Sequence, residues 1–107
     1  MSDNPRPQLY GARYTAVIAD RTDDLGEHSY TVTGKHCEEE VLVRRVLLPG
    51  PRRGDVLAIP AAGAYTLALS SNYNLLPRPA AVLVADGQAR VIRRRETLED
   101  VLSLEAP

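Results

Sequence analysis

The 107-residue chain is long enough for one small domain with a single hydrophobic core and too short for two catalytic domains. Hydrophobic residues make up 44% of it and charged residues 25%, which is typical of a folded globular protein. Thirteen basic residues against fourteen acidic ones leave a net charge of -1, so the chain lacks the basic surface used to bind nucleic acid or an anionic membrane.

Cysteine usage and hydropathy indicate the cellular setting. Cys37 is the only cysteine, so no intramolecular disulfide can form, which favours a reducing cytoplasm. The apolar runs are far shorter than the ~18 residues that a membrane span requires. The polar residues 1–4 lack the order of a signal peptide. We therefore expect a soluble, cytoplasmic domain.

The first third of the chain predicts an extended arm followed by two strands. Residues 2–7 carry two prolines, which disfavour a helix and predict an extended arm. Residues 13–19 are rich in β-branched and aromatic side chains and predict a strand. In residues 29–33, Tyr30 and Val32 alternate with Ser and Thr, the pattern of a half-buried strand.

Four more elements follow. The apolar residues 41–48 predict a third strand, and residues 56–59 a short fourth one after a turn rich in Pro and Gly. Residues 81–85 and 89–93 predict a hairpin, because the Asp86-Gly87 pair between them suits a tight turn. Thr97 can cap a short amphipathic helix with Asp100, and we expect this helix to pack on the sheet.

Short strands at roughly ten-residue spacing, with Gly and Pro in the turns, favour an antiparallel arrangement over a βαβ sheet. The expected fold is therefore mainly β, an antiparallel β-sandwich or Greek-key barrel with a short C-terminal helix.

The segment of residues 34–40 combines a base, a thiol and carboxylates. Proton transfer needs such groups within hydrogen-bond reach, which makes Cys37 a candidate. Zinc is disfavoured, because the whole chain has one Cys and two His. His36 and Cys37 would point to opposite faces of a strand, so they make a poor base and nucleophile pair. A solvated polar turn remains the alternative interpretation.

Two further segments could bind anions. Residues 60–66 are small up to Tyr65, so their backbone could approach a phosphate while Tyr65 donates its hydroxyl; a tight packed turn is the alternative. In residues 4–12, Arg6 offers a fork for a carboxylate and Tyr10 a hydroxyl, although an exposed Arg and a core Tyr would explain both residues. Residues 70–74 have no hydrolase signature and predict a loop.

The order of these motifs resembles the diaminopimelate decarboxylases. The motifs are NPRP and LYGA within residues 4–12, GKHCE at 34–38, GAY at 63–65, SNYN at 71–74 and RRRET at 93–97. Glu38 after Cys37 distinguishes them from ornithine-type decarboxylases, which usually have Asp and Gly there. The chain departs from the family after Glu38, where Glu39 and Glu40 replace a small residue, Gly and Asp and leave the turn one residue shorter.

This resemblance implies the C-terminal domain of a two-domain enzyme that converts meso-2,6-diaminopimelate to L-lysine and CO2, the last step of lysine biosynthesis. An N-terminal (β/α)₈ barrel would hold pyridoxal 5'-phosphate on a lysine, and residues 1–12 would lead from it into a β domain of residues 13–107. The enzyme would be a head-to-tail homodimer. The chain alone, without that lysine, is expected to be inactive.

The resemblance also implies residue roles. Arg6 and Tyr10 would bind the distal carboxylate of the substrate, and Tyr65 would contact the substrate and the cofactor phosphate. Cys37 would donate a proton to the decarboxylated carbon and Glu38 would bind the far amino group, both in the partner subunit's site. Two alternatives stay open: a non-catalytic β module for dimerisation or partner binding, and the same domain of a decarboxylase for another basic amino acid.

Overall fold

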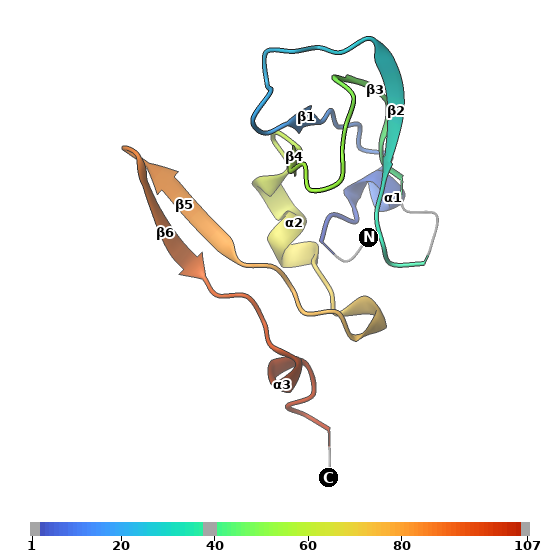
Figure 1. Ribbon diagram of the computed structural model, residues 1–107. Helices are drawn as coiled ribbons and strands as arrows, with labels where there is room; N and C mark the ends of the chain where they lie inside the picture. The colour runs from blue at the N-terminus through green and yellow to red at the C-terminus, as the bar shows by residue number, and fades with distance from the viewer. Residues whose placement is uncertain (1–2, 38–40, 106–107) are drawn as a thin grey trace.

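The computed structural model describes residues 3–37 and 41–105 (Figure 1). The strands are β1 (Val17–Ile18), β2 (His28–Thr33), β3 (Val41–Leu48), β4 (Leu57–Ala58), β5 (Ala81–Ala85) and β6 (Gln88–Arg93). The helices are α1 (Arg6–Tyr10), α2 (Gly63–Leu69), the 3₁₀ turn η1 (Tyr73–Leu75) and α3 (Leu98–Val101).

The core lies between the β2–β3 and β1–β4 pairs, both antiparallel. Strand β3 supplies three of its five buried hydrophobic side chains, and β1 with its preceding residue supplies two; together they are Ala16, Ile18, Val43, Val46 and Leu48. Tyr30 and Val32 of β2 are partly buried against this cluster, which confirms the predicted half-buried strand. Burial of these aliphatic side chains is the main stabilising contribution of the first half of the chain.

The β5–β6 hairpin is confirmed, with the Asp86-Gly87 turn between its strands. Asp86 (φ 50°) and Gly87 (φ 70°) both have the left-handed backbone that a tight hairpin turn requires. Figure 1 shows this hairpin and α3 extending away from the core. The radius of gyration, 15.6 Å, accordingly exceeds the ~13 Å of a compact domain of this length.

Four predictions about local structure need correction. The extended arm is wrong from Arg6 onward, because Pro7 lies in the first turn of α1, where its missing N–H costs nothing. Strands β1 and β4 pair over only two residues each, so they are shorter than predicted. Residues 63–69 form α2 where a turn was expected. Finally, α3 forms with the predicted capping box of Thr97 and Asp100 but buries no residue.

The prediction of a mainly β, antiparallel domain is confirmed: the described residues form three separate two-stranded antiparallel sheets and a few short helices. These sheets do not close into a barrel within residues 3–37 and 41–105. Among the same residues, no helix has the length and apolarity needed to cross a membrane.

Candidate functional site

Arg6 and Tyr65, which are far apart in the sequence, lie together in the fold. The Arg6 guanidinium carbon is 5.7 Å from the centroid of the Tyr65 ring, within the range of a cation–π contact. Arg6 also donates a hydrogen bond from its Nη1 to the Tyr14 hydroxyl at 3.2 Å. Among the described residues no carboxylate pairs with Arg6, so its charge is available to an anion.

Tyr65 stands out from a break in α2. Its backbone is left-handed (φ 67°, ψ -20°) and Ala64 before it is extended in ψ (124°), so the helix is kinked at this point. The side chain is 71% exposed. A residue with a Cβ adopts positive φ at a cost of about 1–2 kcal/mol, and such conformations concentrate at functional sites. The kink presents the Tyr65 ring to solvent beside Arg6.

Tyr10, the last residue of α1, is less closely tied to this pair. Gly11 ends the helix in the left-handed conformation (φ 64°), and the Tyr10 side chain is 67% exposed. No hydrogen bond or ring contact joins Tyr10 to another described residue. The fold therefore leaves its hydroxyl free, and among the predicted site residues that the structure describes, Arg6 and Tyr65 are the two in contact.

Cys37 lies in a different part of the molecule, on the loop that follows β2. Its thiol is free and exposed, and its backbone is left-handed with φ 74°. The preceding residue, His36, is buried at 6% exposure, and this burial lowers the pKa of its imidazole. Glu38, the other predicted residue of this loop, lies outside the described residues.

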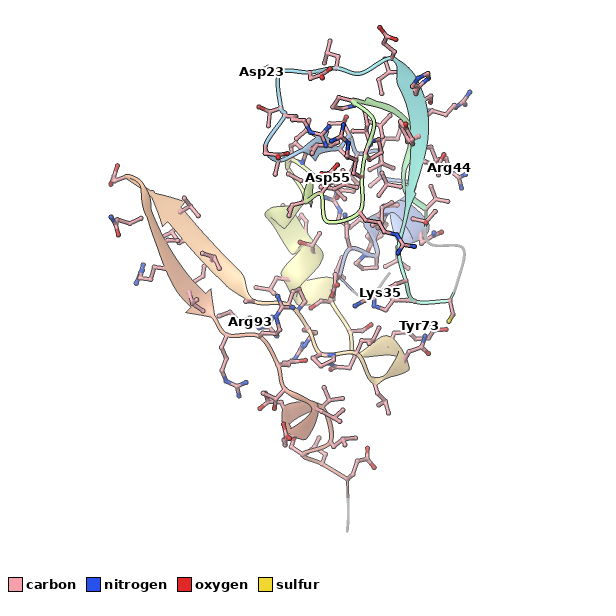
Figure 2. All side chains as sticks on the ribbon, in the orientation of Figure 1. Asp23, Lys35, Arg44, Asp55, Tyr73 and Arg93 are labelled. Carbon is pink, nitrogen blue, oxygen red and sulfur yellow. The ribbon has the colours of Figure 1, made fainter. Side chains whose placement is uncertain are left out.

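A contact that the sequence did not predict connects this loop to η1. The side-chain amide of Asn74 donates a hydrogen bond to the His36 carbonyl at 2.9 Å, across 38 positions of sequence. In the view of Figure 2, Lys35 of the loop and Tyr73 of η1 lie near one another, on the side away from the β5–β6 hairpin. The SNYN motif at 71–74 was the available signal, but a motif alone does not show which segment it contacts.

Glu96 of the RRRET motif, to which the sequence assigns no role, is a second connection of η1. Glu96 accepts hydrogen bonds from the Arg78 backbone N–H at 2.9 Å and from the Arg78 Nε at 2.5 Å, and it pairs with the Arg78 Nη2. Its further partners are the Asn72 amide at 2.6 Å and the Arg93 Nη2 at 3.5 Å. The Arg78 side chain, helped by these other donors, lowers the pKa of Glu96 to about 2. Glu96 therefore stays charged and holds η1 to the segment before α3.

A hollow of about 330 Å³ lies between α1 and β3. Its walls are Pro7, Gln8, Gly11, Ala12, Arg13, Tyr14, Val41, Leu42, Arg44 and Arg45. Neither Arg6 nor Tyr65 nor Cys37 is among them, so this hollow is separate from the candidate residues.

The sheets of this fold match those of a known family of domains. Residues 1–63 match the model of the family described as "Pyridoxal-dependent decarboxylase, C-terminal sheet domain". Since this match covers more than half of the chain, the chain belongs to that family.

Individual relatives carry one particular name within it, diaminopimelate decarboxylase. The protein of that name from Actinosynnema pretiosum is 52% identical over 107 residues, which are 98% of this chain and 24% of the relative. The Synechocystis one is 50% identical over 103 residues, 95% of this chain and 22% of the relative.

A solved structure shows the same arrangement of the chain. The diaminopimelate decarboxylase of Helicobacter pylori, complexed with L-lysine, aligns with a TM-score of 0.85 and 36% identity, over 98% of this chain and 26% of that protein. The chain thus spans about a quarter of the length of the relatives that it matches.

Proposed function

We propose that this chain is the C-terminal domain of a pyridoxal-phosphate-dependent decarboxylase that converts meso-2,6-diaminopimelate to L-lysine and CO2, as the final step of lysine synthesis in a reducing cytoplasm. The contact between Arg6 and Tyr65 carries the proposal, because it places a cation that pairs with no described carboxylate beside an exposed phenol. The names of the relatives support it, as does the L-lysine bound to the Helicobacter pylori enzyme.

The residues present fit part of a pyridoxal phosphate site. The phosphate is an anion, and the Tyr65 hydroxyl is an exposed donor with the Arg6 charge beside it. The only lysine of the sequence, Lys35, lies on the Cys37 loop, and we do not assign it to the cofactor. We assign the lysine that carries the cofactor, and most of the phosphate contacts, to an N-terminal barrel domain.

The carboxylate and ammonium groups of the substrate would be bound by opposite charges. Arg6 would bind the distal carboxylate through its planar fork, and Tyr10 would add its hydroxyl. Glu38 would bind the distal ammonium. A substrate with a second amino acid centre satisfies both charges, whereas ornithine offers only an ammonium there, and this difference would select diaminopimelate.

One proton must be delivered for each turnover. When bound, pyridoxal phosphate withdraws electrons from the carbon that loses CO2. When the bond between that carbon and the carboxylate breaks, the carbon keeps the electron pair of the bond. The Cys37 thiol would then donate its proton to the same carbon, and solvent would return a proton to the thiolate. The loop geometry suits this role because Cys37 is exposed.

Partners are required to complete the site. We propose that the barrel domain adjoins this chain, that its junction involves residues 1–12, and that a second subunit receives Cys37 and Glu38. Two observations support missing neighbours: the Asn4 side-chain amide is buried with no partner among the described residues, and apolar side chains of β5 and β6 are exposed. Such neighbours would also complete the sandwich or Greek-key arrangement of the three sheets.

A chimera tests the proposal. This chain would replace the matching C-terminal segment of the Actinosynnema pretiosum relative, and CO2 release from meso-diaminopimelate would be measured with pyridoxal phosphate present. We expect turnover within about ten-fold of the parent enzyme, because the parts match over 98% of the chain. A chimera that is folded and cofactor-loaded but releases no CO2 would refute the proposal. Release from ornithine instead would favour a decarboxylase for another basic substrate.

The Arg6 role has its own test in the same chimera. Arg6→Met should lower kcat/KM for diaminopimelate by about 100-fold, because a charge-assisted pair is lost. Tyr14→Phe is the matched control: it removes the hydroxyl that accepts from Arg6 but leaves the guanidinium. An equal loss in both variants would assign Arg6 a structural role only.

A further inference from the structure

We propose that Asn74 is a positioning residue for Cys37: its side-chain amide holds the peptide bond before Cys37, and so fixes where the thiol delivers its proton. This inference rests on the proposed function, because it gives Cys37 the proton-donor role. The inference also goes beyond the proposed function, because it assigns a role to the SNYN motif. The proposed contacts with the substrate and the cofactor assign none to that motif.

The Cys37 backbone needs an external restraint. Its φ of 74° lies in the left-handed region, which costs a residue with a Cβ about 1–2 kcal/mol. Such a conformation persists only where surrounding contacts hold it. The Cys37 side chain is exposed and cannot supply that restraint by its own packing.

The Asn74 hydrogen bond acts at the right atom. It reaches the carbonyl oxygen of His36, which belongs to the rigid peptide plane that joins His36 to Cys37. Fixing that oxygen fixes the orientation of the Cys37 N–H and limits rotation about the next bond. His36 itself is buried, so the peptide is held from one side by packing and from the other by Asn74.

Asn74 lies in the η1 turn, which other hydrogen bonds hold in place. Its own φ is 57°, a conformation that Asn tolerates better than other residues with a Cβ. Asn72, at the start of the turn, donates from its amide nitrogen to the Leu76 carbonyl at 3.1 Å and to the Glu96 carboxylate at 2.6 Å. Glu96 is in turn paired with Arg78. The η1 turn is therefore tied at its base, and Asn74 extends from it to the Cys37 loop.

The test uses the chimera described above. Asn74→Gly deletes the amide but keeps the positive φ accessible, so it removes the hydrogen bond without adding backbone strain. We expect kcat to fall about ten-fold, because a small displacement of a reacting group is costly, while KM and the cofactor absorbance stay unchanged. Asp86→Gly is the matched control, since it replaces another positive-φ residue in the distant β5–β6 turn and should leave kcat unchanged.

A double-mutant cycle separates positioning from general structural support. If Asn74 acts through Cys37, Asn74→Gly should cause no further loss of kcat in a Cys37→Ala background. Losses that multiply in the double variant would overturn the proposal. A rise in KM, or a loss of bound cofactor, as large as the fall in kcat would also overturn the proposal.

Thiol alkylation provides a readout that does not depend on turnover. Iodoacetamide labelling of the Cys37 peptide, followed by mass spectrometry, should change in rate by at least about two-fold in Asn74→Gly, because thiol reactivity depends on its surroundings. An unchanged rate would overturn the positioning role. A changed rate in a chimera that is folded and cofactor-loaded but releases no CO2 would instead refute the proposed function alone.

Discussion

The two halves of the molecule are stabilised in different ways. In residues 13–59 the strands pack on one another, and the chain buries all five of its described core side chains there. After Leu48 no described residue is buried. The second half is held instead by the ladder of one hairpin and by polar contacts around Glu96. The comparison teaches that one amphipathic strand pattern can give a packed sheet or an uncovered one, depending on what lies opposite it.

Two glycines with similar backbones provide the strongest test of this difference. In the first half, a Cβ on Gly26 (φ +65°) would lie 2.0 Å from the carbonyl carbon of Leu48; in the second, a Cβ on Gly87 (φ +70°) would meet nothing within 4 Å. Gly26→Ala should therefore destabilise the chain by at least about 3 kcal/mol, and Gly87→Ala by only about 1 kcal/mol.

The measurement is urea unfolding of both variants followed by circular dichroism. Similar losses at the two glycines would show that the backbone around Gly26 yields to the added methyl group, and that the first half is packed no more tightly than the hairpin turn.

A matched pair of valines comes next in size. Val43 of β3 is 2% exposed and Val84 of β5 is 70% exposed. Val43→Ala should cost about 2 kcal/mol through lost burial and the cavity left behind, whereas Val84→Ala should change the free energy of unfolding by less than about 0.5 kcal/mol. Denaturation midpoints of the isolated chain measure both. A large loss at Val84 would mean that β5 packs against something in solution.

The cap of α3 predicts a smaller, local effect. The Thr97 hydroxyl accepts from the Asp100 backbone N–H at 3.3 Å, and the Asp100 carboxylate accepts from the Thr97 N–H at 2.8 Å. Thr97→Ala should cost about 1 kcal/mol, so amides of α3 should exchange about five-fold faster. Hydrogen exchange at Val101 and Leu102 measures this. Thr22→Ala, at an exposed loop position, is the control and should leave exchange at α3 unchanged. Unchanged exchange at α3 in Thr97→Ala would show that the cap does not stabilise the helix.

Local sequence signals predict the elements whose cause is local. The hairpin follows from two alternating segments and Asp86-Gly87, and the α3 cap follows from Thr97 and Asp100; both form as predicted. The lengths of β1 and β4 did not follow, because a strand extends only as far as its partner and each pairs over two residues. The helix α2 did not follow, because it is interrupted by non-helical backbone at Ala64 and Tyr65 and buries no residue, so no buried apolar face marks it.

The candidate site shows the same limit. Arg6, Tyr65 and Cys37 were chosen from the resemblance and from side-chain chemistry, but their arrangement depends on tertiary contacts. Nothing in the spacing of Arg6 and Tyr65 predicts their contact at 5.7 Å. The sequence predicts a loop at Asn74 and no role for it, because its partner, the His36 carbonyl, lies 38 positions away. Backbone atoms carry no residue identity, so a sequence motif cannot indicate such a contact.

The dependence of the second half on charge can be tested by pH. The pKa of Glu96 falls from 4.5 in the unfolded chain to about 2 in the folded one, chiefly through the hydrogen bond from Arg78. A carboxyl whose pKa is lowered by folding contributes stability that is fully present above pH 4.5 and is lost as the pH falls toward about 2. Glu96→Gln should therefore be less stable than the parent chain at neutral pH, and the gap should close across that window.

The measurement is the urea midpoint of both chains between neutral pH and about pH 2, a range that spans both pKa values. Glu27→Gln is the control, because Glu27 is exposed and forms no ion pair with a described residue, so its midpoint should follow that of the parent chain at every pH. A gap at Glu96 that persisted in acid would mean that Gln fails there by shape and not by charge. A gap that closes would instead show that η1, and with it Asn74, is held in place by a charged contact where the first half relies on buried side chains.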